Sequence, residues 1–220
     1  HAAVGGTARP CVLGTLVLLP DRRDAQVRFG KGVEAENIDR ALVEWGRPMG
    51  PLRLIDEIGV DITVDIAATL ENSLGARARP SAILQKMREA KMLGRKSGSG
   101  FYKYEGKTQS PNDALQDWRS NTGASPGDLA TRLVYLMVNE AARCLEEKVV
   151  AAPEDADYGM ILGTGFAPLR GGPLRFADHF GSAKLISAVA GEGEKFQPCD
   201  LLRQHADKNT KFYEDTARSA

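Results

Sequence analysis

The sequence contains one ten-residue segment twice, and this duplication constrains the fold more than any other feature. Residues 50–59 (GPLRLIDEIG) align with residues 172–181 (GPLRFADHFG), and six of the ten positions are identical. Upstream, Lys31 to Asp39 matches Lys148 to Asp157, with Pro153 as one inserted residue. Each copy is short, so each is expected to bury its apolar face against the other. The duplication therefore predicts two related units.

Both units are predicted to be helical. Within residues 36–45, Ile38 and Leu42 recur at the spacing of one helix face. Pro51 and Gly59 suit the first turn and the end of the helix that follows. Further helices are expected over residues 61–74, 81–93, 114–121, 129–147 and 182–190. The expected fold class is all-α, with two related helical domains packed as a pseudo-dimer.

Composition changes along the chain suggest where these units begin and end. We expect a first repeat over residues 31–108, a linker over residues 109–127 and a second repeat over residues 128–220. The linker is poor in apolar residues and contains Pro111, Gly123, Pro126 and Gly127. Residues 1–30 belong to neither pattern and are treated as an atypical segment.

Charge and hydropathy exclude several classes of protein. The chain has 29 basic and 29 acidic residues, whereas a nucleic-acid-binding protein usually has a basic surplus. The longest apolar run, Val12 to Leu19, is too short to span a bilayer, and no signal-peptide cleavage site follows it. We therefore expect neither a nucleic-acid partner nor a membrane span. Because the chain begins at His1 rather than Met, we also expect the true N-terminus to lie upstream.

The titratable and nucleophilic residues form no recognisable catalytic or metal-binding pattern. The glycines of residues 94–100 follow a helix and precede aromatic residues, whereas a dinucleotide loop precedes a helix whose N-terminus holds the phosphate. These residues are therefore interpreted as an irregular connector. Cys144 lies on an apolar helix face and is expected to be a small core residue. No set of His, Cys, Asp and Glu has metal-ligand spacing.

Four motifs together are similar to the duplicated C-terminal region of the multifunctional enzymes of fatty-acid β-oxidation. They are GRPMGPLRLIDEIGVD (residues 46–61), GRKSGSGFYKY (94–104), MVNEAARCLEE (137–147) and GMILGTGFAPLRGGPLRFADHFG (159–181). In that family, an enoyl-CoA hydratase module and a Rossmann-type 3-hydroxyacyl-CoA dehydrogenase module precede two related helical domains. The resemblance covers about residues 31–220 and implies helical domains like the C-terminal domain of 6-phosphogluconate dehydrogenase.

The same resemblance implies NAD as cofactor, bound by the Rossmann module together with a catalytic His–Glu pair. These residues contain no such module, so no catalytic or cofactor-binding residue transfers. The family's Pro-Gly-Phe-x-x-Asn-Arg pattern is replaced here by Ala8-Arg9-Pro10-Cys11-Val12, which lacks the asparagine. His179 and His205 are interpreted as polar residues without a catalytic role, and Asn139 as a helix–helix contact.

One loop does receive a site assignment. Pro48, Met49, Gly50 and Pro51 join two predicted helices and offer an apolar wall with little side-chain bulk. In the family, the corresponding loop faces the acyl chain of the substrate, so these residues are expected to line an acyl pocket. The alternative is a plain helix–helix turn, because the duplicated Gly171-Gly172-Pro173 turn needs no substrate.

Residues 1–29 do not resemble the amphipathic first helix of the family. The segment Leu19 to Ala25 can be encoded by codons that, read one base later, give Tyr-Leu-Ile-Asp-Ala-Met, which is apolar and helix-forming. We therefore hypothesise a frameshift, natural or from sequencing, that ends near Gly30. On this hypothesis the segment is poorly ordered and the first repeat lacks one helix.

Two functions remain open from the sequence. The first is the C-terminal part of a dehydrogenase that oxidises 3-hydroxyacyl-CoA to 3-ketoacyl-CoA with NAD, in which these helices shape the substrate cleft and the fragment alone is inactive. The second is a non-catalytic helical interaction or dimerisation module derived from that family. The expected partners are acyl-CoA, the Rossmann and hydratase modules of the parent and a thiolase subunit. The expected location is the bacterial cytoplasm, with a mitochondrial location left open.

Overall fold

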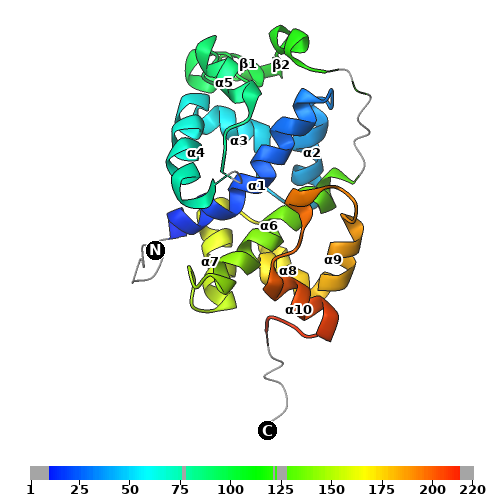
Figure 1. Cartoon of the computed structure of the whole chain (residues 1–220). Helices are drawn as coiled ribbons and strands as arrows, with labels where there is room; N and C mark the ends of the chain where they lie inside the picture. Colours follow the sequence, from blue (N-terminus) through cyan, green and yellow to red (C-terminus); the bar gives the residue numbers. More distant parts are fainter. Residues whose placement is uncertain (1–9, 76–77, 121, 123–127, 214–220) are drawn as a thin grey trace. The chain divides into compact units, whose positions relative to one another are not determined.

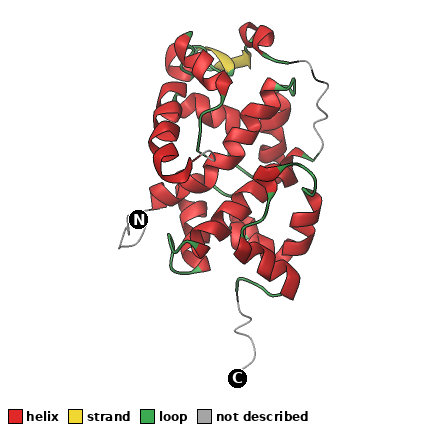
Figure 2. Ribbon diagram, in the orientation of Figure 1, coloured by secondary structure: helices red, strands yellow, loops and turns green. Residues whose placement is uncertain are grey.

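The computed structural model describes residues 10–75, 78–120, 122 and 128–213. These residues are mostly helical, with one two-stranded sheet (Figures 1 and 2), so the all-α prediction is confirmed. The chain divides into two compact units, one formed by residues 19–133 and the other by residues 1–18 with 134–220. The division falls inside α1 (Pro10–Gly30) and inside α6 (Leu129–Glu146), so each of these helices contributes to both units.

The unit of residues 19–133 contains the second half of α1, four complete α-helices and one pair of strands. Its elements are α2 (Ala35–Trp45), α3 (Pro51–Ile58), α4 (Val60–Leu74), α5 (Ala82–Glu89), β1 (Tyr102–Glu105) and β2 (Thr108–Pro111). Neighbouring helices pack in sequence, α2 on α3, α3 on α4 and α4 on α5. Fully buried apolar side chains, including Ile38, Leu42, Leu52 and Ile55, form its core.

The second unit repeats this order of helices. Most of α6 belongs to it, together with α7 (Pro153–Thr164), α8 (Pro173–Phe180), α9 (Ser182–Ala188) and α10 (Asp200–Lys208). Helices α3 and α8 have the same length, begin with a proline in the first turn and end at glycines with positive φ. Because Gly59 and Gly181 adopt φ of 106° and 98°, conformations that side chains disfavour, both copies turn sharply into the next helix.

Several predicted elements differ from those observed. The helix expected over residues 81–93 ends at Glu89, and Lys91 adopts a left-handed φ of 58°. The helix expected over 114–121 is a 3-10 helix, Asp113–Trp118. The glycine-rich connector leads into the antiparallel pair β1–β2, which was not predicted and in which Tyr102 pairs with Pro111. The pair has only four residues per strand, too few for a strong period-two pattern.

Part of the predicted linker is packed onto the first unit. The Arg119 side chain donates hydrogen bonds to the Phe29 carbonyl (3.2 Å) and to both carboxylate oxygens of Glu34 (2.9 and 3.2 Å). The backbone N–H of Ser120 donates to the Gly30 carbonyl at 2.7 Å. Residues 121 and 123–127 of that linker lie outside the described residues.

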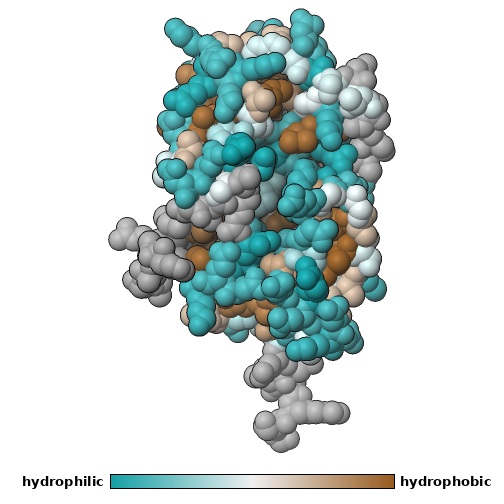
Figure 3. Space-filling model, in the orientation of Figure 1, coloured by the Kyte–Doolittle hydropathy of each residue, from teal (hydrophilic) through white to brown (hydrophobic). Residues whose placement is uncertain are grey.

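The face drawn in Figure 3 is mainly hydrophilic, with apolar side chains scattered among charged ones. Among the described residues, no helix is long and apolar enough to cross a membrane.

The prediction that the first repeat lacks its first helix is wrong. Residues 10–30 form α1, and Leu13, Val17, Ala25 and Phe29 are at most 3% exposed. The Phe29 ring meets Phe101 edge to face, with centroids 5.2 Å apart. These apolar positions bury enough surface to hold the helix despite a polar stretch between them.

That polar stretch is nevertheless poorly suited to its surroundings. Asp21 and Asp24 are each only 1% exposed. Asp24 forms a buried ion pair with Arg132 at 2.6 Å. Neither carboxylate oxygen of Asp21 has a hydrogen-bond partner among the described residues, and the Arg47 guanidinium lies 3.8 Å away. An unsatisfied buried carboxylate destabilises a fold, because burial removes the water molecules that hydrate it and no protein hydrogen-bond donor replaces them.

The frameshift hypothesis makes a specific prediction for the coding DNA. The shifted string would put isoleucine at position 21 and methionine at position 24, which are two positions that the fold buries. Sequencing the gene across codons 19–30 decides the matter. Codons that give Tyr-Leu-Ile-Asp-Ala-Met when read one base later support the hypothesis. Codons that cannot give an apolar helix in that frame would refute it.

A second prediction concerns Pro20, which lies inside α1. A proline in a helix interior removes one backbone hydrogen bond and clashes with the carbonyl four residues earlier, at a cost of about 3 kcal/mol. We expect Pro20→Ala to raise the free energy of unfolding by about 1–3 kcal/mol, measured by urea denaturation. The matched control is Pro173→Ala in the first turn of α8, where proline suits the helix and no gain is expected. A Pro20→Ala variant no more stable than the parent would contradict this account.

Candidate functional site

The candidate site is the loop of residues 46–51, which joins α2 to α3 and contains the four predicted site residues. Its entry is a helix end: Gly46 adopts a φ of 120°, and the N–H of Arg47 donates to the Leu42 carbonyl at 2.9 Å. Within it, Pro48 is exposed and Met49 half-buried, whereas Gly50 and Pro51 are buried. The loop therefore presents Pro48 and part of Met49 to its surroundings on a backbone that is fixed at both ends.

A buried carboxylate fixes the far end of this loop. Asp39, on α2, accepts hydrogen bonds from the N–H groups of Leu52 (2.8 Å) and Arg53 (2.9 Å) in the first turn of α3. It also accepts one from the Tyr102 hydroxyl at 2.7 Å. A Cβ on Gly50 would overlap the Asp39 side chain, so only glycine lets the two chains approach this closely. The positive end of α3 is thus already occupied by a carboxylate of the protein.

A second buried carboxylate holds the glycine-rich segment to the same helix. Asp56, near the end of α3, accepts hydrogen bonds from the backbone N–H groups of Phe101 (2.9 Å) and Tyr102 (3.0 Å). The Tyr104 hydroxyl donates to it at 2.8 Å. A Cβ on Gly94 or Gly100 would overlap Asp56. Gly94 therefore allows a close approach to the Asp56 backbone, and Gly100 allows a close approach to the Asp56 carboxylate.

This arrangement does not fit the diphosphate of NAD. A dinucleotide loop offers backbone N–H groups to an anion, but the N–H groups of Phe101 and Tyr102 already bind the Asp56 carboxylate. A second anion beside Asp56 would meet like charge. The interpretation of residues 94–100 as a connector rather than a dinucleotide loop agrees with this geometry, and no hydride-transfer step is assigned to these residues.

The second copy reproduces the three hydrogen bonds of the first carboxylate and the two backbone hydrogen bonds of the second. Asp157 accepts hydrogen bonds from the N–H groups of Leu174 (2.8 Å) and Arg175 (2.9 Å) and from the Tyr213 hydroxyl (2.7 Å). Asp178 accepts hydrogen bonds from the N–H groups that correspond to those of Phe101 and Tyr102. Their donors are Phe212 (2.8 Å) and Tyr213 (3.0 Å). The Phe-Tyr pairs at 101–102 and 212–213 thus belong to the duplication, a sequence signal that the alignment of residues 50–59 with 172–181 did not include.

Burial changes the acidity of these carboxyl groups. It raises the pKa of Asp39, Asp56 and Asp157 to about 6, although the donated hydrogen bonds act in the opposite direction. Burial also raises the pKa of the Tyr102 and Tyr213 hydroxyls, and the neighbouring carboxylates add to that effect. The tyrosines therefore remain hydrogen-bond donors at neutral pH, and the networks act as anchors for the backbone.

The other residues considered from the sequence take structural places. Cys144 is buried, as predicted, and burial raises the pKa of the Cys199 thiol to about 11, which disfavours a thiolate nucleophile. Asn139 binds the loop before α10, since its amide donates to the Gln197 carbonyl (3.0 Å) and accepts from the Cys199 N–H (2.8 Å). Because Cys199 is the N-cap residue of α10, Asn139 links α6 to the start of α10, which agrees with the predicted helix–helix contact. His179 is exposed on α8. The described residues gather no cluster of His, Cys, Asp or Glu that could hold a metal ion.

The buried carboxyl groups predict how stability depends on pH. Unfolded Asp loses its proton near pH 4, whereas the native groups keep theirs to about pH 6. A raised native pKa contributes stability below the unfolded value, and that contribution is lost as pH rises through the native value. We therefore expect the free energy of unfolding to fall between about pH 4 and about pH 7, by about 1–3 kcal/mol per group.

Two matched variants test this account by urea denaturation across the same pH range. Asp39→Asn and Asp157→Asn each remove one titrating group, so each should make the pH dependence shallower. Both should also lower stability, because an amide nitrogen cannot accept the N–H groups of the helix. An unchanged slope in both variants would show that these carboxyl groups do not titrate in the expected range.

Comparison with known proteins adds an independent finding. A family model described as 3-hydroxyacyl-CoA dehydrogenase, C-terminal domain, matches residues 17–104, which include the loop and both carboxylates of the first copy. The fatty acid oxidation complex subunit alpha of Shewanella loihica is 38% identical over 193 residues, which make up 84% of this chain and 27% of that protein. The chain therefore spans 27% of the length of this curated relative.

Two solved structures share the fold. The 3-hydroxybutyryl-CoA dehydrogenase from Escherichia coli K12 superposes with a TM-score of 0.73 at 23% identity, over 92% of this chain and 60% of that chain. The dehydrogenase part of multifunctional enzyme 1 from C. elegans gives a TM-score of 0.61 at 27% identity, over 86% of this chain and 46% of that chain.

Proposed function

Because the chain belongs to the family of 3-hydroxyacyl-CoA dehydrogenase C-terminal domains, we propose that it forms the helical region of a multifunctional fatty-acid β-oxidation enzyme. In the full-length protein, NAD would be held by another module and would accept a hydride from a 3-hydroxyacyl-CoA. The helices of this chain would shape one wall of the substrate cleft. The isolated chain would be inactive, because its described residues supply neither a cofactor site nor a general base.

The observation that carries this proposal is the anchored loop of residues 46–51. Its backbone is fixed by Asp39, while Pro48 and part of Met49 remain accessible. A wall of this kind suits an acyl chain, which needs apolar contact and offers no hydrogen bonds. Met49 is unbranched and flexible, and such a side chain adapts to apolar ligands of different shape. We therefore assign substrate shaping, and no chemical step, to Pro48, Met49, Gly50 and Pro51.

The partners follow from the same proposal. The bacterial relatives are named as subunits of a complex. We extend this to a full-length parent that carries hydratase and Rossmann modules. This parent would act in the bacterial cytoplasm and assemble with a thiolase subunit. Size-exclusion chromatography of the full-length parent with that thiolase tests the assembly.

A chimera tests the activity directly. The matching segment of the Shewanella loihica subunit would be replaced by this chain, which restores the modules that these residues lack. We expect the chimera to reduce acetoacetyl-CoA with NADH and to reduce a long-chain 3-ketoacyl-CoA as well. In the chimera, Met49→Glu should raise the KM for the long-chain substrate by about tenfold or more and change that for acetoacetyl-CoA little, because a charge in the wall opposes only the long acyl chain.

The controls separate this proposal from its alternative. Leu162→Glu, at an exposed position of α7 in the second copy, should leave both KM values unchanged. The chain alone should show no turnover. A folded chimera without activity would favour a non-catalytic interaction module, and equal effects of Met49→Glu on both substrates would argue against an acyl wall at this loop.

A further inference from the structure

The two copies differ in charge at one matched position on α3 and α8. In the first copy, the Arg53 Nε donates to the Glu57 carboxylate at 3.0 Å, and Arg95 donates to the same carboxylate at 3.1 Å. In the second copy, arginine is retained as Arg175, but His179 stands where the first copy has Glu57. The first copy therefore pairs both arginines with a carboxylate on α3. In the second copy, histidine replaces that carboxylate and the Arg175 guanidinium lies over the Tyr213 ring, 3.6 Å from its centroid.

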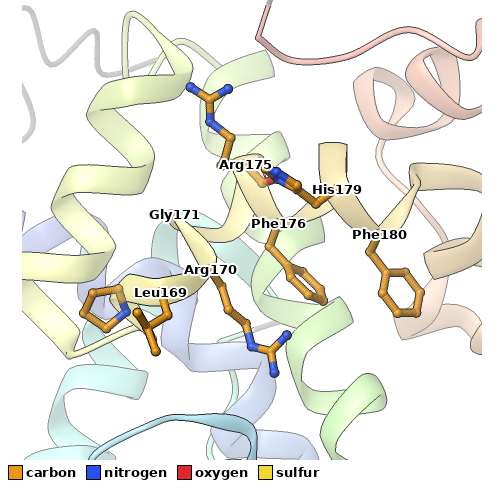
Figure 4. Close-up of a pocket in the computed structure, with 8 residues that line it drawn as sticks. Leu169, Arg170, Gly171, Arg175, Phe176, His179 and Phe180 are labelled. Atoms are coloured by element: carbon orange, nitrogen blue, oxygen red, sulfur yellow. The ribbon is translucent and has the colours of Figure 1, made fainter.

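The changed position lines a pocket of about 570 Å³ on the second copy. Its lining combines cationic and aromatic side chains and contains no carboxylate. The residues are Pro168, Leu169, Arg170, Gly171, Arg175, Phe176, His179 and Phe180. In Figure 4, Arg175 and His179 lie along one edge of α8, while the rings of Phe176 and Phe180 point to the other side, toward which Arg170 also extends. The pocket thus has a cationic edge and an aromatic edge.

The aromatic edge is also particular to the second copy. Phe176 and Phe180 replace Leu54 and Ile58 of the first copy. Their ring centroids are 5.5 Å apart, and the Arg170 guanidinium lies over the Phe176 ring at 5.6 Å from its centroid. Phe180 is 40% exposed and the Leu169 side chain fully so, which leaves apolar surface open to a ligand. Flat rings beside a guanidinium are the surface on which nucleobases stack.

We propose that this pocket binds the phosphorylated nucleotide part of a ligand. A phosphate would take the place that the Glu57 carboxylate has in the first copy, with the Arg175 guanidinium as its donor and His179 beside it. The base would lie against Phe180, which is 40% exposed, beside Arg170, while Phe176 is buried and supports the Phe180 ring. The volume is in the range of sites for small ligands, which is about 300–1,000 Å³. Coenzyme A and free adenine nucleotides share this chemistry, and the site is built from the second copy alone.

Isothermal titration calorimetry of the 220-residue chain with coenzyme A, ADP, inorganic phosphate and pantetheine identifies which part of the ligand the pocket binds. Coenzyme A and ADP should both bind, inorganic phosphate should bind more weakly, and pantetheine, which has no nucleotide, should not bind. Tighter binding of coenzyme A than of ADP would identify the coenzyme as the ligand, and equal binding would identify free nucleotides as sufficient. No binding of either, or binding of pantetheine as tight as that of coenzyme A, would overturn the proposal.

Exchanging the two matched residues provides the control. His179→Glu would restore the first copy's arginine–carboxylate pair in the pocket, and it should weaken ADP binding by about tenfold or more without lowering the melting temperature. Glu57→His makes the opposite change in the first copy and should leave ADP binding unchanged. A third variant, Phe180→Ala, should weaken the binding of ADP but not that of inorganic phosphate. Unaltered ADP affinity in folded His179→Glu protein would also overturn the proposal.

Discussion

Each copy of the duplicated unit depends on one carboxylate that is buried against the first turn of a short helix. Asp39 and Asp157 accept two backbone N–H groups and one tyrosine hydroxyl each, so they join three separate segments of the chain. The helices they cap have eight residues, a length at which isolated helices are unstable in water. Tertiary capping by a carboxylate that cannot reach water replaces the stability that such helices lack.

This constraint explains which residues the two copies share. The glycine before each helix admits the carboxylate, the proline fixes the first turn, and the second aspartate binds the Phe-Tyr segment. All of these residues hold the backbone. Other positions of the same helices make none of these contacts and differ between the copies: exposed Glu57 is replaced by exposed His179, and half-buried Leu54 is replaced by buried Phe176. The two copies therefore share the residues that hold the backbone and differ at other positions of these helices.

The sequence predicted the elements that depend on local pattern. Helices α2 and α3 could be placed because apolar spacing, proline and glycine all mark them, and α8 followed from the alignment. The carboxylate networks could not be predicted, because Asp39 and Tyr102 are far apart in sequence and only the fold brings them together. The same reason hid β1 and β2, whose short strands are fixed by Asp56 rather than by their own alternation. For the site, the sequence located the loop of residues 46–51 but not what holds it.

Helix α1 shows the opposite balance between local pattern and tertiary context. Its sequence contains an interior proline and a run of charged residues, and both oppose a buried helix. The helix nevertheless forms, since Ala25 and Phe29 fill the core of the first unit and Leu13 contacts the Gly159 region of the second. The helix is therefore held by its buried apolar side chains, and the side chains of Asp21 and Arg47 are buried as well. A fold that tolerates such a segment has its stability concentrated elsewhere, in the anchored helices that both copies retain.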